Sequence, residues 1–267
     1  MTRSGGSPAA GLPATDGGTS SVYVYAVVRA PFDGVSGDGV GARPGPVRKI
    51  EASGFVAVVS DVPESWRAAG RADVEAHDRV LAGLLERWTV VPMRFGIVMA
   101  TDDEVRERLL ERHAEDLEAL FERLDGRQQM TVKAYYVNEG LLREVLRRNP
   151  ELKRRSDALE REPPAASHQQ RIDLGREVAA AVEEQRALDE RVLVEPLGEA
   201  AEAIRVEPPV SEKQAVTVQL LVDAQRRSRL DAAVQRLSAE HADRLAFRYV
   251  GPLPPYSFCD LILDEER

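Results

Sequence analysis

The spacing of the apolar residues changes near Asn138, and this change limits the folds that the chain can adopt. Before it, segments with an apolar residue at every second position alternate with segments where apolar residues recur every three or four positions. After it, residues 139–205 follow the longer period almost without interruption. Periods of two and of 3.6 residues are typical of strands and helices, respectively. The sequence therefore predicts a mixed α+β and α/β fold with two domains, residues 21–138 and 139–267.

The first domain is predicted to be a sheet with helices packed on it, in the order βββαβαβ. The expected strands are residues 21–30, 47–53, 54–62, 89–98 and 130–137, and the expected helices are residues 74–88 and 101–126. The first strand carries apolar side chains on both faces, so it should be buried on both sides. Pro92 indicates a sheet edge or a bulge, because proline cannot donate to the ladder. Thr101 and Glu104 have the spacing of a capping box, which predicts the start of the second helix.

The second domain is predicted to begin with helices and to end with a βαβ unit. Its main apolar stripe consists of Leu174, Val178, Val182, Gln185, Leu188 and Val192, and breaks are expected at Pro163, Pro164 and Pro196. Residues 215–223 and 244–251 have the alternation of strands, and the segment between them has the helical period. These patterns predict a helix-rich α/β domain that is closed by an extended C-terminal segment.

Composition excludes several classes of protein. The chain has 267 residues, and 36 Lys and Arg residues against 45 Asp and Glu residues give it a net charge of −9. Nucleic acids and anionic membranes require a basic surface, so neither is an expected partner. No apolar run approaches the ~18 residues that a membrane-spanning helix needs. Residues 1–20 are rich in Gly, Pro, Ser and Thr, which predicts a disordered leader on a cytoplasmic protein.

The sequence contains no recognisable catalytic motif. Its four histidines lack the spacing of metal ligands, and neither a nucleophile motif nor a phosphate-binding loop is present. Cys259, the only cysteine, lies among apolar residues, which favours a buried thiol over a nucleophile. His77 lies in the apolar stripe of the first helix. An imidazole bonded to a backbone group or a carboxylate is expected there, with a catalytic or ligand role as the alternative. We expect a binding or structural protein with no enzymatic activity, metal or cofactor.

Arg94 lies inside an apolar segment, and two placements are open for it. The side chain points to solvent by simple alternation, or it pairs with a buried carboxylate. We expect the guanidinium to be ordered against a carboxylate or backbone carbonyls where its strand meets a helix. Neither placement by itself indicates an enzyme.

The segment GPLPPYSFCDL, residues 251–261, places three prolines and two aromatic residues close to the end of the chain. Gly251 and Pro252 are expected to end the preceding strand, because proline has no amide hydrogen for the ladder. The next two prolines should keep the chain extended. Tyr256 and Phe258 are then expected to be buried on the other domain and to lock the two domains together. The alternative is a surface that another protein recognises.

Three stretches taken together resemble the gas vesicle protein GvpF/GvpL family. They are VYVYAVV (residues 22–28), HDRVLAGLLERWTVVPMRFGIVMATDDEVRERL (residues 77–109) and GPLPPYSFCDL (residues 251–261). The RFG and PPYSF segments are specific in combination. The resemblance extends from about Ser21 to Leu263 and therefore covers nearly everything except the leader.

This resemblance implies a non-enzymatic minor or accessory component of gas vesicles, which are hollow, protein-walled buoyancy organelles. It implies as partners the small hydrophobic shell protein and other accessory proteins, and a fold of two α/β domains of which the first is ferredoxin-like. The candidate structural or partner-contact positions are His77, Arg94, Phe95, Gly96, Pro254, Pro255, Tyr256 and Phe258. The alternative function is a small-molecule-binding regulatory module, because a fold alone does not decide function.

Overall fold

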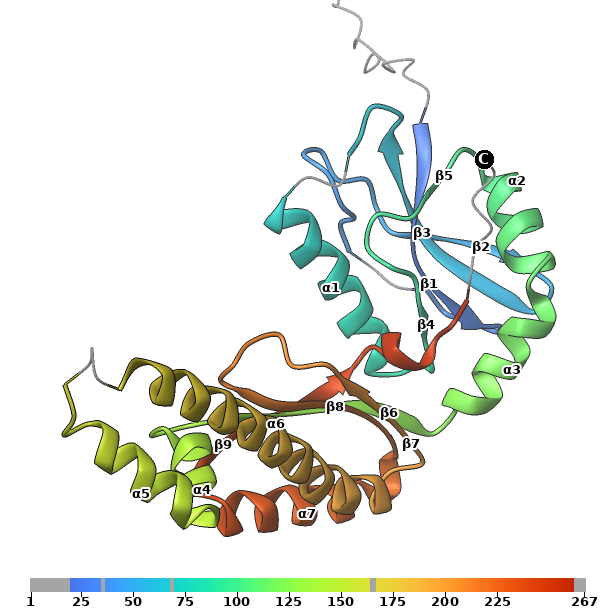
Figure 1. Ribbon diagram of the computed structural model, residues 1–267. Coiled ribbons are helices and arrows are strands. Elements are labelled where there is room, and N and C mark those ends of the chain that lie inside the picture. The colour runs from blue at the N-terminus through green and yellow to red at the C-terminus, as the bar shows by residue number, and fades with distance from the viewer. Residues whose placement is uncertain (1–19, 35–36, 68–69, 164–166, 262–267) are drawn as a thin grey trace, which may run out of the picture.

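The structure, a computed structural model, describes residues 20–34, 37–67, 70–163 and 167–261, so the predicted leader lies outside the described residues. It contains two separate β-sheets, each with its own helices (Figure 1). The predicted α+β class is confirmed. Within the described residues, no helix is both long enough and apolar enough to cross a membrane.

The first sheet is built around β1 (Ser20–Arg29), which pairs on both of its edges. β3 (Phe55–Pro63) lies on one edge and is followed by β2 (Arg48–Ala52). Two short strands, β4 (Val91–Pro92) and β5 (Val98–Met99), pair with the other edge. Nearly all of β1 is buried, as its apolar residues on both faces predict.

The prediction of a single strand at residues 89–98 is wrong, because β4 and β5 are separated by a turn. Phe95 and Gly96 form this turn, and Gly96 has a φ of +95°. A positive φ favours glycine and takes the chain out of the extended conformation. Pro92 does lie at the sheet edge, as predicted.

Helices cover both faces of the first sheet. α1 (Arg71–Leu85) packs on one face, and a longer helical segment packs on the other (Figure 1). That segment consists of α2 (Asp102–Glu104), the π-helical η1 (Val105–Glu111) and α3 (Ala114–Leu124). The predicted N-cap is confirmed, because the Thr101 hydroxyl accepts a hydrogen bond of 3.1 Å from the Glu104 amide. The Glu104 carboxylate accepts from the Ala100 amide at 2.6 Å instead of from the Thr101 amide, so the capping box is only half formed.

The second sheet has four antiparallel strands in the order β7-β8-β6-β9. The strands are β6 (Arg127–Tyr136), β7 (Ala203–Glu207), β8 (Gln214–Asp223) and β9 (Leu245–Leu253). The prediction that residues 130–137 belong to the first sheet is wrong, because β6 pairs with β8 and β9. Apolar alternation identifies a strand but not its partners. We therefore propose that the domains divide after Gly126 instead of after Asn138.

The second half follows the order of a ferredoxin-like fold. β8 and β9 both run antiparallel to β6, which lies between them, and α7 (Arg227–Glu240) connects β8 to β9 as predicted. Together with the helices between β6 and β7, this gives the βαββαβ order. The ferredoxin-like arrangement was expected in the first domain. It lies in the second, because β6 belongs to the second sheet.

Three helices occupy most of the region that was predicted to be helical, namely α4 (Gly140–Arg148), α5 (Pro150–Leu159) and α6 (His168–Glu199). Pro196 lies inside α6 and does not break it. A proline near a helix end removes a single backbone hydrogen bond, and the remaining packing retains the helix. The end of the predicted helical region forms β7 instead, where Ile204 and Val206 pair with residues of β8.

A buried charged cluster joins the elements of the second domain. The Asp189 carboxylate accepts hydrogen bonds from the Tyr136 hydroxyl (2.9 Å), the Gln185 amide (2.9 Å) and the Arg244 guanidinium (2.7 Å). Only 2% of the Asp189 side chain and 12% of the Arg244 side chain are exposed. The predicted stripe includes Gln185 but assigns the next buried position to Leu188 instead of Asp189, so this cluster was not predicted from the sequence.

Candidate functional site

The C-terminal ribbon, residues 251–261, runs from the edge of the second sheet to the first domain (Figure 1). The preceding strand does not end at Gly251 and Pro252, as predicted. β9 shifts its register there and continues to Leu253, and such an irregularity accommodates a proline in a ladder. The predicted extended strand after the prolines is a 3₁₀ turn instead, η3 (Tyr256–Phe258).

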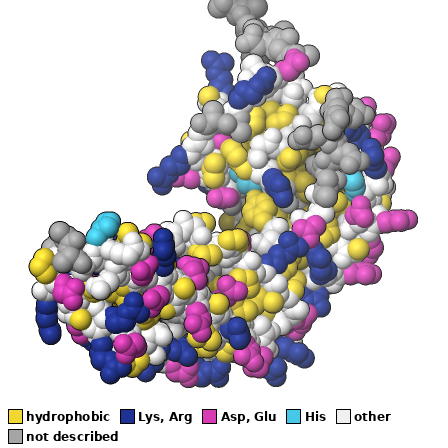
Figure 2. Space-filling model, viewed as in Figure 1, with side chains coloured by type: hydrophobic (Ala, Val, Ile, Leu, Met, Phe, Trp, Pro, Cys, Tyr) yellow, Lys and Arg dark blue, Asp and Glu magenta, His cyan; other side chains and the backbone are white. Residues whose placement is uncertain are grey.

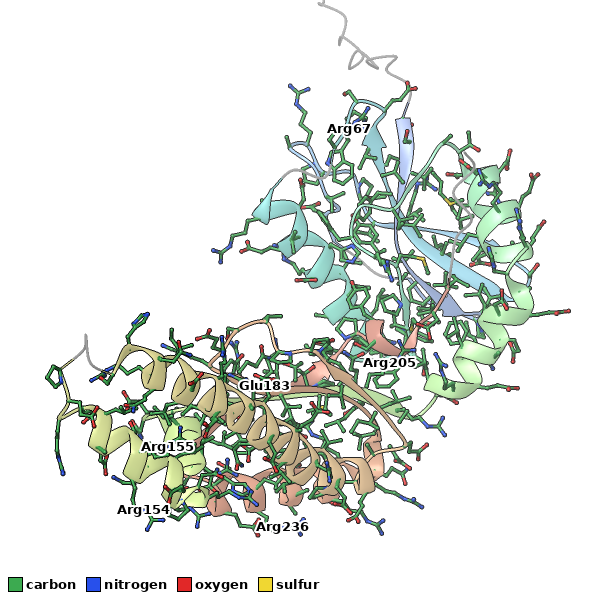
Figure 3. All side chains as sticks on the ribbon, viewed as in Figure 1. Arg67, Arg154, Arg155, Glu183, Arg205 and Arg236 are labelled. Carbon is green, nitrogen blue, oxygen red and sulfur yellow. The ribbon has the colours of Figure 1, made fainter. Side chains whose placement is uncertain are left out.

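The ribbon contacts both domains. Phe258 is 3% exposed and packs in the core of the first domain, as predicted. Its carbonyl oxygen accepts a hydrogen bond from Arg123 of α3. Asp260 forms an ion pair with Arg205 of β7, whose side chain reaches the ribbon (Figure 3). Tyr256 was also expected to be fully buried, but 37% of it is exposed.

His77 lies at the centre of a buried hydrogen-bonded chain. Its Nδ1 lies 2.8 Å from the Tyr23 hydroxyl, and its Nε2 lies 2.8 Å from the Tyr256 hydroxyl. The Tyr23 hydroxyl also accepts a hydrogen bond of 3.1 Å from the Gly96 amide. The expected partner of His77 was a backbone group or a carboxylate. The structure adds two tyrosines, one from β1 and one from the ribbon, to a backbone interaction of His77 at Met93.

The Tyr23 hydroxyl already accepts a hydrogen bond from the Gly96 amide, so we infer that its own hydrogen is donated to His77. Tyr23 donates its hydroxyl hydrogen to Nδ1, and Nε2–H donates to the Tyr256 oxygen. The imidazole is neutral in this arrangement. Burial also favours the neutral form, because it lowers the pKa of His77, and the nearby Asp78 and a hydrogen bond with the Met93 backbone oppose this effect only in part. The Tyr256 hydroxyl then has its own hydrogen left to donate toward the surface.

Acidification is expected to destabilise the protein through His77. The folded state holds a neutral imidazole, while the unfolded chain binds a proton near the ordinary pKa of about 6.5. The unfolded state therefore binds more protons, and the free energy of unfolding falls as the pH drops below that value. The limit for one group is about 1.4 kcal/mol per pH unit. Urea denaturation near pH 7.5 and pH 5.5 measures the effect. His77→Gln should lose part of this pH dependence, and an unchanged dependence contradicts the assignment.

Two pockets share Tyr256 as a lining residue, and we call them together the ribbon groove. The larger has a volume of about 660 Å³ and is lined by His77, Asp78, Pro92, Met93, Arg94, Phe95, Ile97, Tyr256, Ser257, Cys259 and Leu261. The smaller has a volume of about 440 Å³ and is lined by Asp78, Ala82, Leu85, Glu86, Gln129, Pro252, Leu253, Pro254 and Tyr256. Figure 2 shows apolar side chains gathered where the two domains meet. The groove thus combines apolar and charged side chains, and the smaller pocket is the more apolar of the two.

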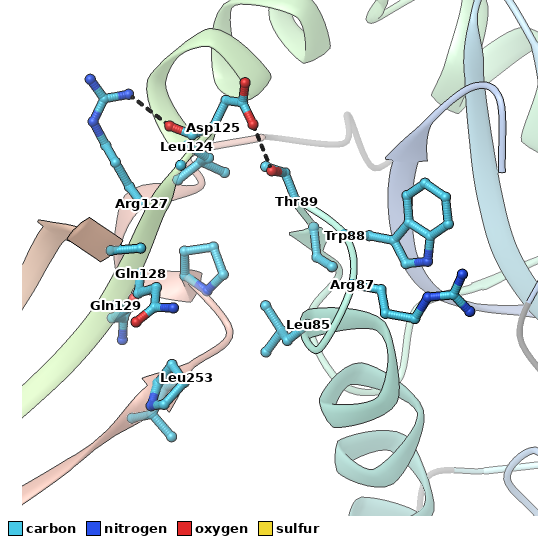
Figure 4. A pocket seen from close by; sticks show the side chains of 15 residues that line it. Leu85, Arg87, Trp88, Thr89, Leu124, Asp125, Arg127, Gln128, Gln129 and Leu253 are labelled. Carbon is cyan, nitrogen blue, oxygen red and sulfur yellow. Dashed lines mark hydrogen bonds between the residues drawn. The ribbon is translucent and has the colours of Figure 1, made fainter.

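A third pocket of about 310 Å³ lies behind the ribbon, where the chain passes from the first domain to the second (Figure 4). The Thr89 hydroxyl donates to the Asp125 carboxylate at 3.1 Å, and Arg127 donates to the Asp125 carbonyl at 3.3 Å. Leu85 and Leu253 face the pocket from α1 and from β9 (Figure 4). This pocket shares Leu85 and Leu253 with the ribbon groove, and the hydrogen bonds of Asp125 hold the chain at the junction between the two domains.

Arg94 is exposed at the rim of the larger pocket. Among the described residues, its side chain has neither a hydrogen bond nor an ion pair, so the expectation of an ordered guanidinium is wrong. The turn at Phe95 and Gly96 explains the difference, because it ends the strand and carries Arg94 into solvent. Phe95 itself packs against the Tyr23 and His77 rings, with centroid distances of 6.3 and 5.7 Å.

The structure brings together three segments that are far apart in the sequence. Tyr23 comes from residues 22–28, His77 from residues 77–109 and Tyr256 from the ribbon, and hydrogen bonds join them in series. Pro255 is buried in the ribbon, and Pro254 lines the smaller pocket. Tyr23 was not predicted from the sequence. The available signal was a tyrosine on a strand buried on both faces, because a buried tyrosine hydroxyl needs a polar partner.

Cys259 and the potential metal ligands are the remaining reactive groups. Burial raises the pKa of the Cys259 thiol to about 12, so this thiol stays protonated at neutral pH. Among residues 20–34, 37–67, 70–163 and 167–261, no group of three or more His, Cys, Asp or Glu side chains could hold a metal ion. The site offers an apolar surface and hydrogen-bond donors, which are suited to binding.

Comparisons with known proteins agree with these features. The family model described as "Gas vesicle synthesis protein GvpL/GvpF" matches residues 21–260. Gas vesicle protein F of Streptomyces sp. (strain CB03234) is 38% identical over 244 residues, which cover 90% of this chain and 100% of that protein. Gas vesicle protein L of the same strain is 38% identical over 126 residues, 42% of this chain and 47% of that protein. The crystal structure of GvpF from Anabaena sp. PCC7120 has a TM-score of 0.81 at 22% identity and covers 91% of this chain and 99% of that chain.

Proposed function

The chain belongs to the gas vesicle synthesis protein GvpL/GvpF family, and on that premise we propose that it acts in gas vesicle assembly without catalysing a reaction. In this proposal it binds the small hydrophobic shell protein and other accessory proteins in the cytoplasm, and associates with the vesicles as they form. The observation that best supports the proposal is the ribbon groove. Three distant segments meet around His77 there and leave apolar side chains accessible to solvent.

The groove has the properties that a carrier of an apolar subunit requires. Such a subunit exposes apolar surface before it assembles, and a carrier must cover that surface while staying soluble itself. Phe95, Ile97 and Leu261 supply apolar lining in the larger pocket, and Leu253 and Pro254 supply it in the smaller one. The net charge of −9 disfavours self-aggregation of the carrier.

Two residues of the groove are of the types that dominate binding energy at protein interfaces. Arginine and tyrosine are enriched among such residues. Arg94 is exposed at the rim without a partner among the described residues, and Tyr256 is held by His77 and lines both pockets. Because its hydroxyl is fixed by His77, Tyr256 loses little further conformational freedom on binding.

Arg94→Met is expected to weaken binding of the shell protein by about tenfold, or about 1.4 kcal/mol, while the free energy of unfolding changes by less than about 0.5 kcal/mol. The side chain has no partner to lose in the folded chain, and methionine retains most of its apolar stem. Co-purification of the shell protein after co-expression measures binding, and urea denaturation measures stability.

Arg191→Met is the matched control. Arg191 is also exposed and also has no side-chain hydrogen bond or ion pair among the described residues, but it lies on α6 in the second domain. This variant should leave both measurements unchanged. Equal co-purification by the two variants contradicts the proposal, and a loss of stability in Arg94→Met assigns that residue a structural role. Saturable metabolite binding without any capture of the shell protein would favour the small-molecule-binding alternative.

A further inference from the structure

β7 forms an edge of the second sheet that is open to solvent. It pairs with β8 on one side, and no other strand in the described part of the chain pairs with its outer side. Exposed fractions are 36% for Ile204 and 40% for Val206, and Val210 just beyond the strand is 91% exposed. Exposed edge strands with β-branched residues readily accept a further strand. The edge of β7 is therefore a candidate surface for strand addition.

The sequence of β7 is complementary to itself in one antiparallel register. Its last four residues are Ile-Arg-Val-Glu, from Ile204 to Glu207. If a two-fold axis passes beside Val206, Val206 faces its own copy, and Arg205 of each chain faces Glu207 of the other. We propose that two copies of this chain associate through their β7 edges in this register, to form one continuous sheet.

Charge complementarity favours a second copy as the occupant. The register creates two reciprocal pairs between Arg205 and Glu207, and directly opposed opposite charges stabilise antiparallel strands. Arg205 and Glu207 are both exposed to solvent. Arg205 already pairs with Asp260, yet 47% of its side chain remains exposed. The Glu207 carboxylate accepts a hydrogen bond of 3.0 Å from Gln219 of the neighbouring strand, which holds it on the same face.

The surroundings of β7 limit the assembly to two copies. Pro208 and Pro209 follow the strand directly and cannot donate to a ladder, so the pairing cannot extend beyond them. Pairing about a two-fold axis uses the same edge in both copies and is closed. Because β7 has five residues, the contact is small, and small interfaces give weak or transient association.

Cysteine cross-linking tests the register directly. In the proposed dimer the two Val206 Cα atoms lie about 4.5–5.5 Å apart, a distance that a disulfide can span. Val206→Cys should therefore form a disulfide-linked dimer under mild oxidation, visible by non-reducing electrophoresis and mass spectrometry. Ile204→Cys is the control. It faces Pro208 of the other copy and lies more than about 10 Å from its own counterpart, so it should remain monomeric. The native thiol of Cys259 is protonated and should contribute little.

Charge reversal distinguishes cross-linking in the proposed register from cross-linking by random collision. In the Val206→Cys background, Glu207→Arg places an arginine opposite Arg205 at both symmetry-related contacts of the dimer. This repulsion should reduce the rate of cross-linking by about tenfold. The double reversal Arg205→Glu with Glu207→Arg restores opposite charges and should recover most of that rate. Equal cross-linking at positions 204 and 206, no cross-linking at 206, or cross-linking in cells only to a different protein would each overturn the proposal.

Discussion

Replacing Arg244 with methionine is expected to lower the free energy of unfolding by about 3–5 kcal/mol. The substitution leaves the Asp189 carboxylate without its cation in a site where only 2% of that side chain is exposed. The Tyr136 hydroxyl and the Gln185 amide still donate to Asp189, but neither neutralises its charge. A buried charge without a partner costs far more than the loss of an exposed ion pair. Chemical denaturation measures this difference.

Two further variants show whether the loss of stability in Arg244→Met comes from the unpaired charge of Asp189. Arg236→Met removes an exposed arginine that lies 4.0 Å from Glu240 on α7, and it should change stability by less than about 0.5 kcal/mol. The double variant Arg244→Met with Asp189→Leu removes both charges and should recover part of the loss. A decrease below about 1 kcal/mol for Arg244→Met alone would show that the pair does not hold β6, α6 and the segment after α7 together.

Phe258→Ala is expected to destabilise the protein by about 3–5 kcal/mol, because it removes a large side chain from a packed core and leaves a cavity. Phe258 belongs to the ribbon but packs among residues of the first sheet and α3. The loss should therefore appear as destabilisation of the first domain. Thermal or urea unfolding of the full-length variant measures it.

The matched control for Phe258→Ala is Tyr256→Phe, which keeps the aromatic ring and removes only the hydrogen bond to His77. This change should cost about 1 kcal/mol. Truncation after Val250 removes the whole ribbon and should abolish cooperative unfolding. A truncated protein that stays soluble and stable but no longer binds the shell protein would contradict the closing role of the ribbon.

Most secondary structure could be predicted from the sequence, but the pairing of strands could not. The strand at residues 130–137 was identified by its alternation. Its partners β8 and β9 begin only at Gln214 and Leu245, and alternation carries no information about which strands pair. For the same reason, the ferredoxin-like order was expected in the wrong domain. The split of residues 89–98 depended on the positive φ at Gly96, which the apolar pattern hid.

The candidate site was predicted only in part. His77 and Tyr256 were identified as candidates, but the hydrogen bond between them joins α1 to the ribbon and has no signal in sequence spacing. Asp189 was missed because its partners, Tyr136 and Arg244, come from elements that only the fold brings together. Arg94 was expected to be ordered where its strand meets a helix, whereas the structure shows the solvent-exposed placement that simple alternation also allowed.

Site-specific photocross-linking during vesicle formation measures whether the ribbon groove holds the shell protein. A photoreactive residue at Ala82 lies on the exposed wall of the ribbon groove, and one at Ala232 lies on an exposed position of α7 in the second domain. We predict that the shell protein is cross-linked at position 82 and not at position 232. Cross-linking of the shell protein at position 232 with none at position 82 would contradict the claim that the ribbon groove binds it.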